Sequence, residues 1–329
     1  MIISILIYSS ISFLVLFLIS KISYSLNLVD APSKRKIHLK STAYTGGIGL
    51  CIIYIAALFL FDFSSDKLNL ILSTAFLIGI VGFIDDKHDL SVGSKLSLQI
   101  IPIIYLIILE NLGLNNIGDY NYFRLELNSF SIPFTLIAIL FLINSFNYFD
   151  GLDGVLSFSI ISTLGILFFL IPNNNIKLFL IIILIPVLFF LCFNFSIFKL
   201  QKLFLGDSGS LLLGFIMAFT LIYLSIQKIV HPILLVFSIS IFIYEFLSIN
   251  LIRLKNKKNI FVPGRDHLHH QLFKYTKSIF QTNFFIFLAN IILFMVGYTS
   301  FLLISPLASL ILFMVFFIIF LILRNKYST

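Results

Sequence analysis

The feature that most constrains this chain is a series of apolar stretches, each long enough or nearly long enough to cross a lipid bilayer. Of the 329 residues, 60% are hydrophobic and only 11% are charged, which is more apolar surface than a soluble domain can bury. Lipid cannot satisfy exposed backbone groups, so the crossing segments must be helices. We therefore predict an all-α polytopic membrane protein, a single integral membrane domain over 1–329. About eleven transmembrane helices are expected, at 2–20, 47–61, 68–84, 96–109, 132–146, 155–171, 178–195, 209–226, 232–252, 284–301 and 305–323.

The basic residues predict the orientation of these spans. An odd number of crossings places the two ends on opposite sides of the membrane. With the N-terminus outside and the C-terminus in the cytoplasm, 18 of the 22 Lys and Arg residues fall in inner segments, as the positive-inside rule requires. This distribution accounts for the formal net charge of +8 without a nucleic-acid partner. The first apolar run lacks a preceding basic residue and a cleavage site, so we expect a retained span.

Polar residues gather in five clusters, and all five lie on the predicted cytoplasmic side. The clusters are 30–38 with the glycine pair 46–47, 85–91 with Lys95 and Gln99, 144–154, 204–210 and 264–270. Five separate loops on one face predict a composite active site at the membrane surface. The longest outer loop, 110–131, carries partial alternation at 122–127 that indicates a small hairpin.

Two adjacent acids, Asp85 and Asp86, end the third apolar span, where an unpaired carboxylate is costly. A single aspartate there would most simply mark a solvated helix end. Two of them, with Asp89 one turn further on, favour a functional role. Clustered carboxylates are hard oxygen ligands that suit Mg²⁺. They can also act as a base toward a phosphate or its water.

Four polar side chains recur every three residues at the end of the fifth span, namely Asn144, Asn147, Asp150 and Asp153. On a helix this spacing keeps neighbours within reach of one ligand. The alternative is a cap and turn, because Asn, Asp and Gly favour such places, and it readily explains Gly151 and Gly154. It does not easily explain four such side chains at the mouth of a span.

Two further clusters carry groups suited to phosphate. Asp207 or Ser208 could simply cap the helix that follows, but a helix start also offers free N–H groups to phosphate or a metal–phosphate complex. The histidine motif 267–270 lacks a nearby cysteine, and consecutive histidines seldom face one zinc ion. A solvated loop is its plain alternative. With Arg265 the motif fits better as donors to a diphosphate.

These five clusters, in this order over roughly residues 30–272, resemble the polyprenyl-phosphate N-acetylhexosamine-1-phosphate transferases, the WecA/MraY family of glycosyltransferase 4 type. The resemblance implies transfer of an amino-sugar 1-phosphate from a UDP-N-acetylhexosamine to undecaprenyl phosphate in the bacterial inner membrane, with UMP released. It implies the first membrane step of cell-surface polysaccharide synthesis, Mg²⁺ as cofactor with Mn²⁺ as a substitute, and leaves a homodimer open. The His-Leu-His-His form resembles the WecA-like branch, so the implied donor is UDP-GlcNAc or a relative.

The resemblance also implies roles for individual residues. The catalytic set is Asp85, Asp86, His267, His269 and His270. The metal ligands are Asn147 and Asp207. The substrate-binding set is Asp153, Asp150, Phe204, Asn194, Arg265, Lys36, His38 and Lys95. Three positions depart from the family pattern: Ala43, where proline is frequent; Glu245, where aspartate is usual; and Leu254, where a second arginine is common.

Two other classes of function compete with a transferase. A secondary transporter or lipid flippase would place ionisable groups near the bilayer midplane, within repeated halves. Here the acids gather at one boundary, and the sequence has no evident repeat. A non-catalytic assembly subunit would not need all five clusters. Sequence alone does not separate direct attack by the lipid phosphate from a covalent aspartyl intermediate.

Overall fold

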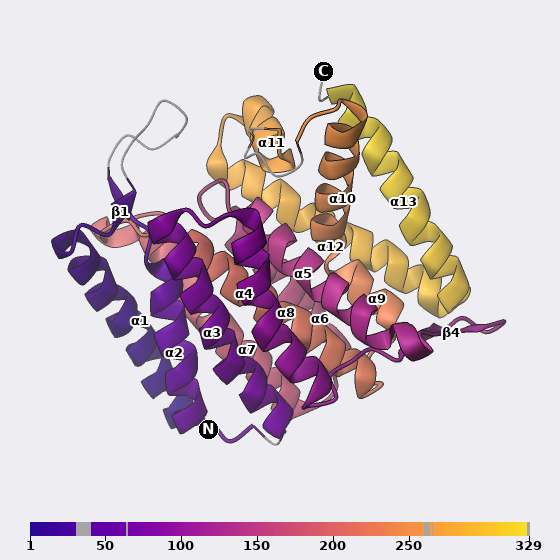
Figure 1. Ribbon diagram of the computed structural model, residues 1–329, viewed down its shortest axis with the longest axis horizontal. Coiled ribbons are helices and arrows are strands. Elements are labelled where there is room, and N and C mark those ends of the chain that lie inside the picture. The colour runs from indigo at the N-terminus through magenta and orange to yellow at the C-terminus, as the bar shows by residue number, and fades with distance from the viewer. Residues whose placement is uncertain (31–40, 64, 260–263, 265, 328–329) are drawn as a thin grey trace. The chain divides into compact units, whose positions relative to one another are not determined.

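The computed structural model describes residues 1–30, 41–63, 65–259, 264 and 266–327. The chain forms two compact units, whose helices and strands are labelled in Figure 1. The first unit comprises Met1–Leu106 and Asn173–Met217, and the second comprises Ile107–Pro172 and Ala218–Thr329. Each unit is described by itself below. The prediction of a single domain stays a prediction.

The first unit is a bundle of long helices with one short hairpin. Its elements are α1 Ile2–Ser25, β1 Val29–Asp30, β2 Thr42–Ala43, α2 Gly46–Leu60, α3 Asp66–His88, α4 Val92–Ile108, α7 Asn174–Asn194, the 3₁₀ turn Ile197–Lys199 and the first half of α8 Gly206–Ile226. Helix α2 packs against α1, α3 and α7.

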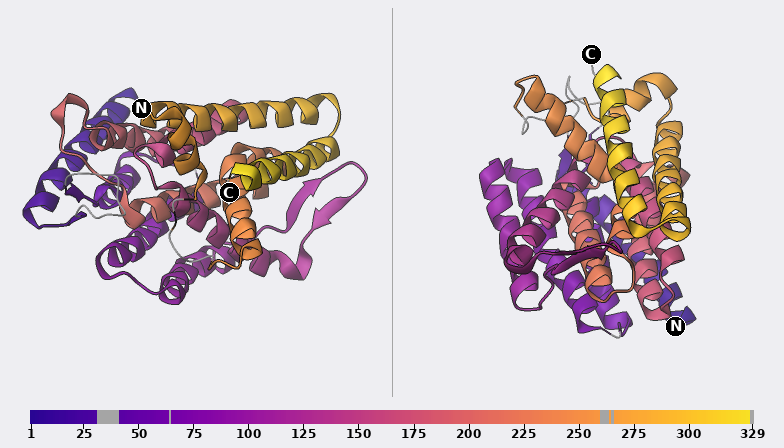
Figure 2. Two further views of the ribbon diagram at one scale, coloured as in Figure 1. Left: turned by 90° about the horizontal axis from the view of Figure 1, so that it is seen from above. Right: turned by 90° about the vertical axis from the view of Figure 1, so that its right-hand side faces the viewer.

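The second unit adds a protruding hairpin to its helices. Its elements are β3 Asn116–Asp119, β4 Arg124–Glu126, the 3₁₀ turn Asn128–Phe130, α5 Ser131–Phe149, α6 Val155–Leu170, the second half of α8, α9 Pro232–Ser238, α10 Ser240–Lys255, α11 Leu268–Thr276, α12 Ile279–Leu303 and α13 Pro306–Tyr327. Helix α12 packs against α6, α9 and α13, and α12 and α13 run side by side (Figure 2). The antiparallel β3–β4 pair confirms the hairpin predicted in the outer loop.

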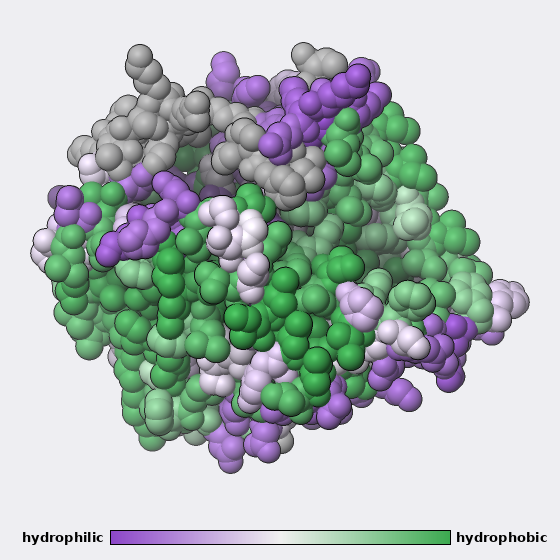
Figure 3. Space-filling model, viewed as in Figure 1, coloured by the Kyte–Doolittle hydropathy of each residue, from purple (hydrophilic) through white to green (hydrophobic). Residues whose placement is uncertain are grey.

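The helices confirm an all-α polytopic membrane protein. Among the described residues, seven helices are long and apolar enough to cross a membrane, and the bent pair α9–α10 makes up to eight. The remaining three predicted spans are the shorter apolar helices α2, α4 and α6, of 15 to 17 residues. Apolar side chains cover the visible flanks of the helices and hydrophilic ones gather near their ends (Figure 3). Eleven full crossings and their orientation therefore stay predictions.

A proline inside α7 shows how the first unit satisfies its backbone in an apolar setting. Pro186 has no N–H, so the carbonyl of Ile182, four residues earlier, loses its helical donor. The buried hydroxyl of Tyr8 on α1 donates to that carbonyl at 3.1 Å. Tyr54 on α2 donates to the neighbouring Ile183 carbonyl at 3.0 Å. Tyr8 thus replaces the missing bond, and the two tyrosines together tie α1 and α2 to α7.

The second unit contains a break that the sequence did not predict, because the span expected at 232–252 is bent by 73° between α9 and α10. Asn290 on α12 supplies the polar partners that the break exposes. Its side-chain Nδ2 donates to the Ser238 carbonyl at 2.9 Å, and its Oδ1 accepts from the Ser240 hydroxyl at 3.3 Å. Thr163 on α6 donates to the same Ser238 carbonyl at 3.0 Å. Polar groups on two neighbouring helices make the broken span tolerable in lipid.

Two more differences concern helix ends. The break expected between the spans 284–301 and 305–323 occurs just before Pro306, since α12 continues to Leu303. Residues 268–276, expected as part of a loop, form the short helix α11.

Candidate functional site

In the first unit, the structure brings three of the predicted acids around one lysine. Lys95 Nζ, near the start of α4, lies 2.7 Å from Asp85 Oδ2 and also contacts Asp207 Oδ2. The backbone N–H of Leu90 donates to Asp85 Oδ1 at 2.8 Å, which holds the end of α3 in a tight turn. We call Asp85, Asp86, Lys95 and Asp207 the carboxylate cluster.

Asp86 ties the end of α3 to the beginning of α8. Its Oδ1 accepts from the N–H of Asp207 at 2.8 Å, and its Oδ2 accepts from the N–H of Ser208 at 3.1 Å. A helix start carries unpaired N–H groups and a partial positive charge, so a carboxylate there is stabilised. Asp86 therefore acts as an N-cap supplied by another helix. Asp207 and Ser208 lie in the first turn of α8, so the cap that the sequence expected from one of them comes from Asp86 instead.

Two glycines make this approach possible. Gly206 has a φ of +72°, a left-handed conformation that L side chains rarely adopt. A Cβ at Gly206 would lie 2.5 Å from the Tyr44 carbonyl oxygen and 2.7 Å from Asp86 Oδ2. A Cβ at Gly82 on α3 would lie 2.5 Å from the backbone carbonyl of Asp207. The two helices therefore meet backbone to backbone, and this contact sets the positions of the acids.

The carboxylate cluster, as defined above, holds three carboxyl groups and one ammonium group. The Asp207 side chain is 33% exposed, so it is open to a ligand while it contacts Lys95. Among the described residues, no three His, Cys, Asp or Glu side chains form a complete metal site. Mg²⁺ in nucleotide enzymes usually takes one or two carboxylates and completes its shell with waters and phosphate oxygens. The hard oxygen donors of the cluster fit that partial kind of site.

Two other predicted residues of the first unit are Asn194, the last residue of α7, and Phe204, which lies just before α8. Asn194 is buried, and its Nδ2 donates to the Leu203 carbonyl at 2.8 Å, so it shapes the segment before α8 from within. The Phe204 carbonyl accepts from the N–H of Gly46 at 2.9 Å. The ammonium of Lys202 lies 5.2 Å from the centre of the Phe204 ring. The aromatic ring is thus half-buried beside a basic side chain at the beginning of α8.

In the second unit, the three histidines of the motif gather at the start of α11. The rings of His267 and His269 are parallel with centroids 5.5 Å apart, and the His269 and His270 centroids are 4.3 Å apart. Tyr148 on α5 packs edge-on against His267 at 5.2 Å. We call His267, His269 and His270 the histidine cluster.

The turn between α5 and α6 faces this cluster. A Cβ on Gly151 would lie 2.4 Å from His269 Nε2 and 3.3 Å from His270 Nε2. Helix α5 ends at Phe149, so Asp150 is its C-cap and the three-residue spacing does not continue along one helix. The cap-and-turn interpretation is therefore correct from this residue onward. Asn147 stays on the last turn of α5.

Asp153 completes the turn, and its carbonyl accepts from Asn283 Nδ2 on α12 at 2.7 Å. Gly154, with a φ of +74°, then starts α6. The turn thus carries Asn147, Asp150 and Asp153 within one short segment that contacts the histidine cluster through Gly151. Their roles in binding stay predictions.

Burial and charge set the protonation of the residues around α11. Burial first, and then the neighbouring His270, His267 and Arg324, lower the pKa of His269 well below its usual value. His269 is therefore neutral at pH 7. Burial alone would raise the pKa of Asp266, but the Arg253 guanidinium lowers it to about 2.

That guanidinium holds Asp266 with two hydrogen bonds. Arg253 Nε lies 2.9 Å from Asp266 Oδ2, and Nη2 lies 2.7 Å from Oδ1. The sequence did not assign either residue a role. It also missed Arg324 on α13, which contacts Glu245 in a fully buried ion pair. The available signal was a lone arginine at the end of an apolar run, where such a charge needs a partner.

Three predicted residues, Lys36, His38 and Arg265, lie outside the described part of the chain. The two proposed metal ligands, Asn147 and Asp207, belong to different units. A joint site for them therefore stays a prediction.

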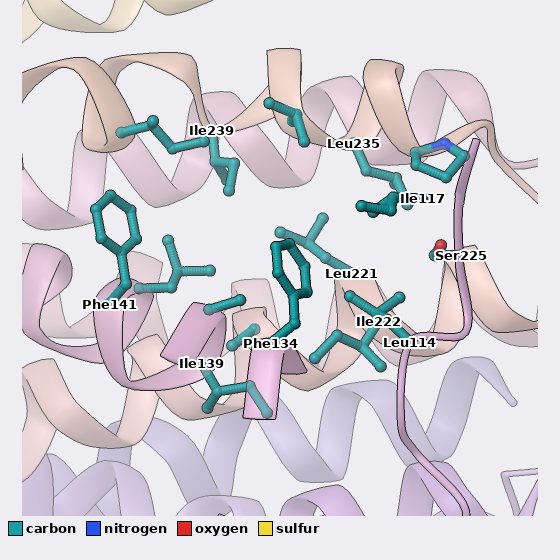
Figure 4. Close-up of a pocket in the computed structure, with 16 residues that line it drawn as sticks. Leu114, Ile117, Phe134, Ile139, Phe141, Leu221, Ile222, Ser225, Leu235 and Ile239 are labelled. Carbon is teal, nitrogen blue, oxygen red and sulfur yellow. The ribbon is translucent and has the colours of Figure 1, made fainter. Parts of the chain in front are cut away.

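An apolar cavity of about 180 Å³ lies within the second unit (Figure 4). Side chains of α5, of the second half of α8 and of α9 line it, with Phe134 and Leu221 pointing toward one another. Apart from Ser225, its lining among the described residues is entirely apolar. Such a cavity suits a hydrocarbon chain.

The chain is similar to known membrane transferases. A family model described as glycosyl transferase family 4 matches residues 68–225. The undecaprenyl-phosphate alpha-N-acetylglucosaminyl 1-phosphate transferase of Yersinia pestis is 28% identical over 296 residues, 86% of this chain and 79% of that protein. Its counterpart in Escherichia coli K12 is 28% identical over 294 residues, with coverages of 86% and 79%. A probable undecaprenyl-phosphate N-acetylglucosaminyl 1-phosphate transferase of Bacillus subtilis is 29% identical over 268 residues, with coverages of 79% and 74%.

Proposed function

We propose that this chain is a member of glycosyl transferase family 4, whose model matches residues 68–225, and that it transfers N-acetylglucosamine 1-phosphate, or the 1-phosphate of a related N-acetylhexosamine, from a UDP-sugar to undecaprenyl phosphate. An oxygen of the lipid phosphate attacks the phosphorus that carries the sugar. The bond from that phosphorus to the bridging oxygen breaks, and UMP leaves with the bridging oxygen and its electron pair. One phosphoanhydride replaces another, so the chief obstacle is the approach of two anions.

The observation that carries this proposal is the carboxylate cluster at the start of α8. Asp85 and Asp207 meet Lys95 at the boundary of apolar helices, and Asp86 binds the N–H of Asp207 beside them, so the acids are concentrated where an unpaired carboxylate is costly. Lys95 lies between two of the acids and is our candidate for contacting the incoming phosphate. The side chain of Asp207, 33% exposed, is more open to solvent than that of Asp85, 12% exposed. Asp85 and Asp86 are our candidates for the base or for supporting the site.

The donor set of the cluster fits Mg²⁺, with Asp207 and the amide oxygen of Asn147 as the proposed ligands. When bound, the ion would neutralise charge on the diphosphate. The chain's own residues have separate tasks. Asp86 fixes the start of α8, and with it the place of Asp207, by accepting two backbone hydrogen bonds.

The histidine cluster supplies the second part of the proposed site. His269 is neutral at pH 7, so its ring can donate one hydrogen bond without adding a full positive charge. We assign His267, His269 and His270 to the diphosphate, with Arg265 beside them. Asp150 and Asp153 are assigned to the uridine, and Phe204 to stacking on the uracil. Lys36 and His38 complete the proposed basic surface that attracts the donor.

The membrane arrangement is also part of the proposal. We infer eleven crossings in the inner membrane of a bacterium, the N-terminus outside and both clusters at the cytoplasmic boundary. The basic residues, 18 of 22 in the inner segments, support this orientation. The apolar cavity of Figure 4 offers room for part of the polyprenyl chain. The oligomeric state is left open.

A transfer assay with purified protein tests the function. Detergent-solubilised chain is incubated with UDP-GlcNAc, undecaprenyl phosphate and Mg²⁺, and the lipid-linked sugar and UMP are quantified. Both products should appear in equal amounts, and omission of the lipid or chelation of the metal should stop their formation. A panel of other UDP-N-acetylhexosamines then ranks the donors.

The transporter alternative makes an opposite prediction. It requires uptake of a substrate into vesicles that contain the protein, without any lipid-linked product. Absence of product from every UDP-sugar tested, with active protein shown by such uptake, would reject the transferase proposal.

A further inference from the structure

A single buried carboxylate in the second unit holds both the first histidine and the helix that carries the other two. Glu245 on α10 is fully buried. Its Oε1 lies 3.2 Å from His267 Nδ1 and accepts from the N–H of Leu268, the first residue of α11, at 3.1 Å. This one oxygen therefore fixes the start of α11 and the ring of His267 together.

An arginine from a distant part of the chain completes this arrangement. Arg324 on α13 is 4% exposed. Its Nη2 donates to Glu245 Oε1 at 3.0 Å, and its Nη1 contacts Glu245 Oε2. The same Nη2 also donates to the carbonyl of Asp266, directly before the histidines. The planar guanidinium thus spans the carboxylate and the loop, which a lysine could not do in the same way.

The chemistry of the pair indicates more than attachment of one helix to another. Two apolar side chains would join α10 and α13 at lower cost, because burying an ion pair requires the desolvation of both charges. An ionised carboxylate next to His267 Nδ1 requires the ring proton to be on Nδ1. Glu245 then fixes the proton on Nδ1, and Nε2 is the ring nitrogen left for contact with a ligand. Glu245 Oε1 contacts the ring of His267 and the N–H of Leu268 at the start of α11. Both contacts therefore help to fix the position of the histidine cluster.

We propose that Glu245 and Arg324 are positioning residues for the transfer reaction, and that their ion pair sets the tautomer of His267 and the placement of α11. This inference rests on the proposed function. It makes α13 a part of the site although none of its residues belongs to either cluster. The family usually has aspartate at the position of Glu245. Glu245 then has a specific function in the site of this chain.

Steady-state kinetics test the role through a set of variants. Arg324→Gln should lower kcat by about 10²-fold, because an ångström-scale displacement of reacting groups has an effect of this order. The KM for the UDP-sugar should change by less than about 3-fold, as expected when positioning and not binding is lost. Lys326→Gln is the matched control, an exposed basic residue in the same last turn, and should leave kcat unchanged.

A double variant separates positioning from stability. Arg324→Met combined with Glu245→Met removes both charges and leaves no ion unpaired, so its melting temperature should equal or exceed that of either single variant. Its kcat should nevertheless stay about 10²-fold below that of the parent chain. Recovery of the parental kcat in the double variant would overturn the proposal, since the pair would then be merely structural.

A chemical readout makes the inference independent of the proposed function. Diethyl pyrocarbonate modification of each histidine is followed by mass spectrometry. His269, fully buried in the parent chain, should react slowly there and at least about 10-fold faster in Arg324→Gln. An unchanged rate would contradict the positioning role. Absence of transfer by the parent chain would instead reject the proposed function, and the modification rates would still decide whether the pair positions the cluster.

Discussion

The carboxylate cluster and the histidine cluster are held by different kinds of contact. In the first, glycines bring the backbones of α3 and α8 together, and Asp86 binds backbone N–H groups directly. In the second, side-chain ion pairs from α10 and α13 hold the loop and helix that carry the rings. Backbone contacts leave little freedom, whereas side chains can adjust. Substitutions should therefore affect the two clusters to different degrees.

The two clusters also differ in their charge balance. Near the histidines, two acids each have their own arginine: Arg324 for Glu245 and Arg253 for Asp266. Among the described residues, the ion pairs of the carboxylate cluster join one ammonium group, that of Lys95, to both Asp85 and Asp207. The histidine cluster is thus supported by one-to-one ion pairs, whereas two acids of the carboxylate cluster share one lysine.

The largest effect should come from removing one charge of the carboxylate cluster. Asp207→Asn keeps the size of the side chain and the start of α8 but removes a proposed metal ligand. Transfer should fall by about 10³-fold or more, since electrostatic stabilisation is usually the largest catalytic contribution. Folding should be maintained, because Lys95 keeps its ion pair with Asp85. The rate of UMP release checks this, with the exposed Asp119→Asn of β3 as control, and normal turnover would remove the metal assignment.

A glycine substitution tests the rigidity of the first cluster. In Gly82→Ala the new methyl group would lie 2.5 Å from backbone atoms of Asp207, which cannot rotate away. We expect the chain to lose about 3 kcal/mol of stability through overpacking. Denaturant unfolding in detergent measures the loss. Gly165→Ala on α6, where a Cβ meets nothing within 4 Å, is the matched control and should be neutral or slightly stabilising.

The corresponding change in the second cluster should be milder. In Gly151→Ala the methyl group would meet the ring of His269 at 2.4 Å, and a ring can turn. Stability should fall by about 1 kcal/mol and transfer by about 10-fold. A loss of stability as large as that of Gly82→Ala would break the proposed contrast between backbone and side-chain support.

Acidification should have the smallest effect of these tests. It lowers the free energy of unfolding through His269 and the neighbouring Asp266. The pKa of His269 is lowered on folding. Its contribution to the free energy of unfolding is therefore fully present above about pH 6.5, the pKa of a histidine in the unfolded chain, and declines as the pH falls below that value. The pKa of Asp266 is lowered to about 2, so its contribution declines between about pH 4 and 2. Solvent screening limits the Asp266 share to about 1 kcal/mol. Unfolding curves at stepwise pH check both, and Asp266→Asn should abolish the second decline.

Apolar patterning predicted the helices well because burial in lipid depends on local composition. Every predicted span coincides with a helix or, for 232–252, with a bent pair. The bend itself could not be predicted, since no proline or glycine lies between Pro232 and Lys255. The polar groups at the bend are bound by Asn290, a side chain about fifty residues further along the chain. Local pattern gives a helix, and tertiary partners decide whether it breaks.

The candidate site likewise contains contacts that the local sequence indicates and contacts that it does not. Clustering of Asp85 with Lys95 follows from a short turn between two helices, so the sequence could indicate it. The conjunction of Glu245 and Arg324 spans 79 residues, and nothing local marks these two as partners. The roles assigned from the family resemblance stay predictions until the variants above are measured.

The separation of Glu245 and Arg324 has a consequence for how the protein is made. During synthesis α10 enters the membrane first, and the ribosome must add 79 residues before the arginine follows. A charged side chain in the middle of an inserting helix costs about 3 kcal/mol. Until α13 arrives, α10 carries that cost or keeps its acid protonated. The histidine cluster can therefore reach its final arrangement only after α13 has been inserted. A chain whose synthesis stops earlier would expose a destabilised α10 to the proteases that remove misfolded membrane proteins.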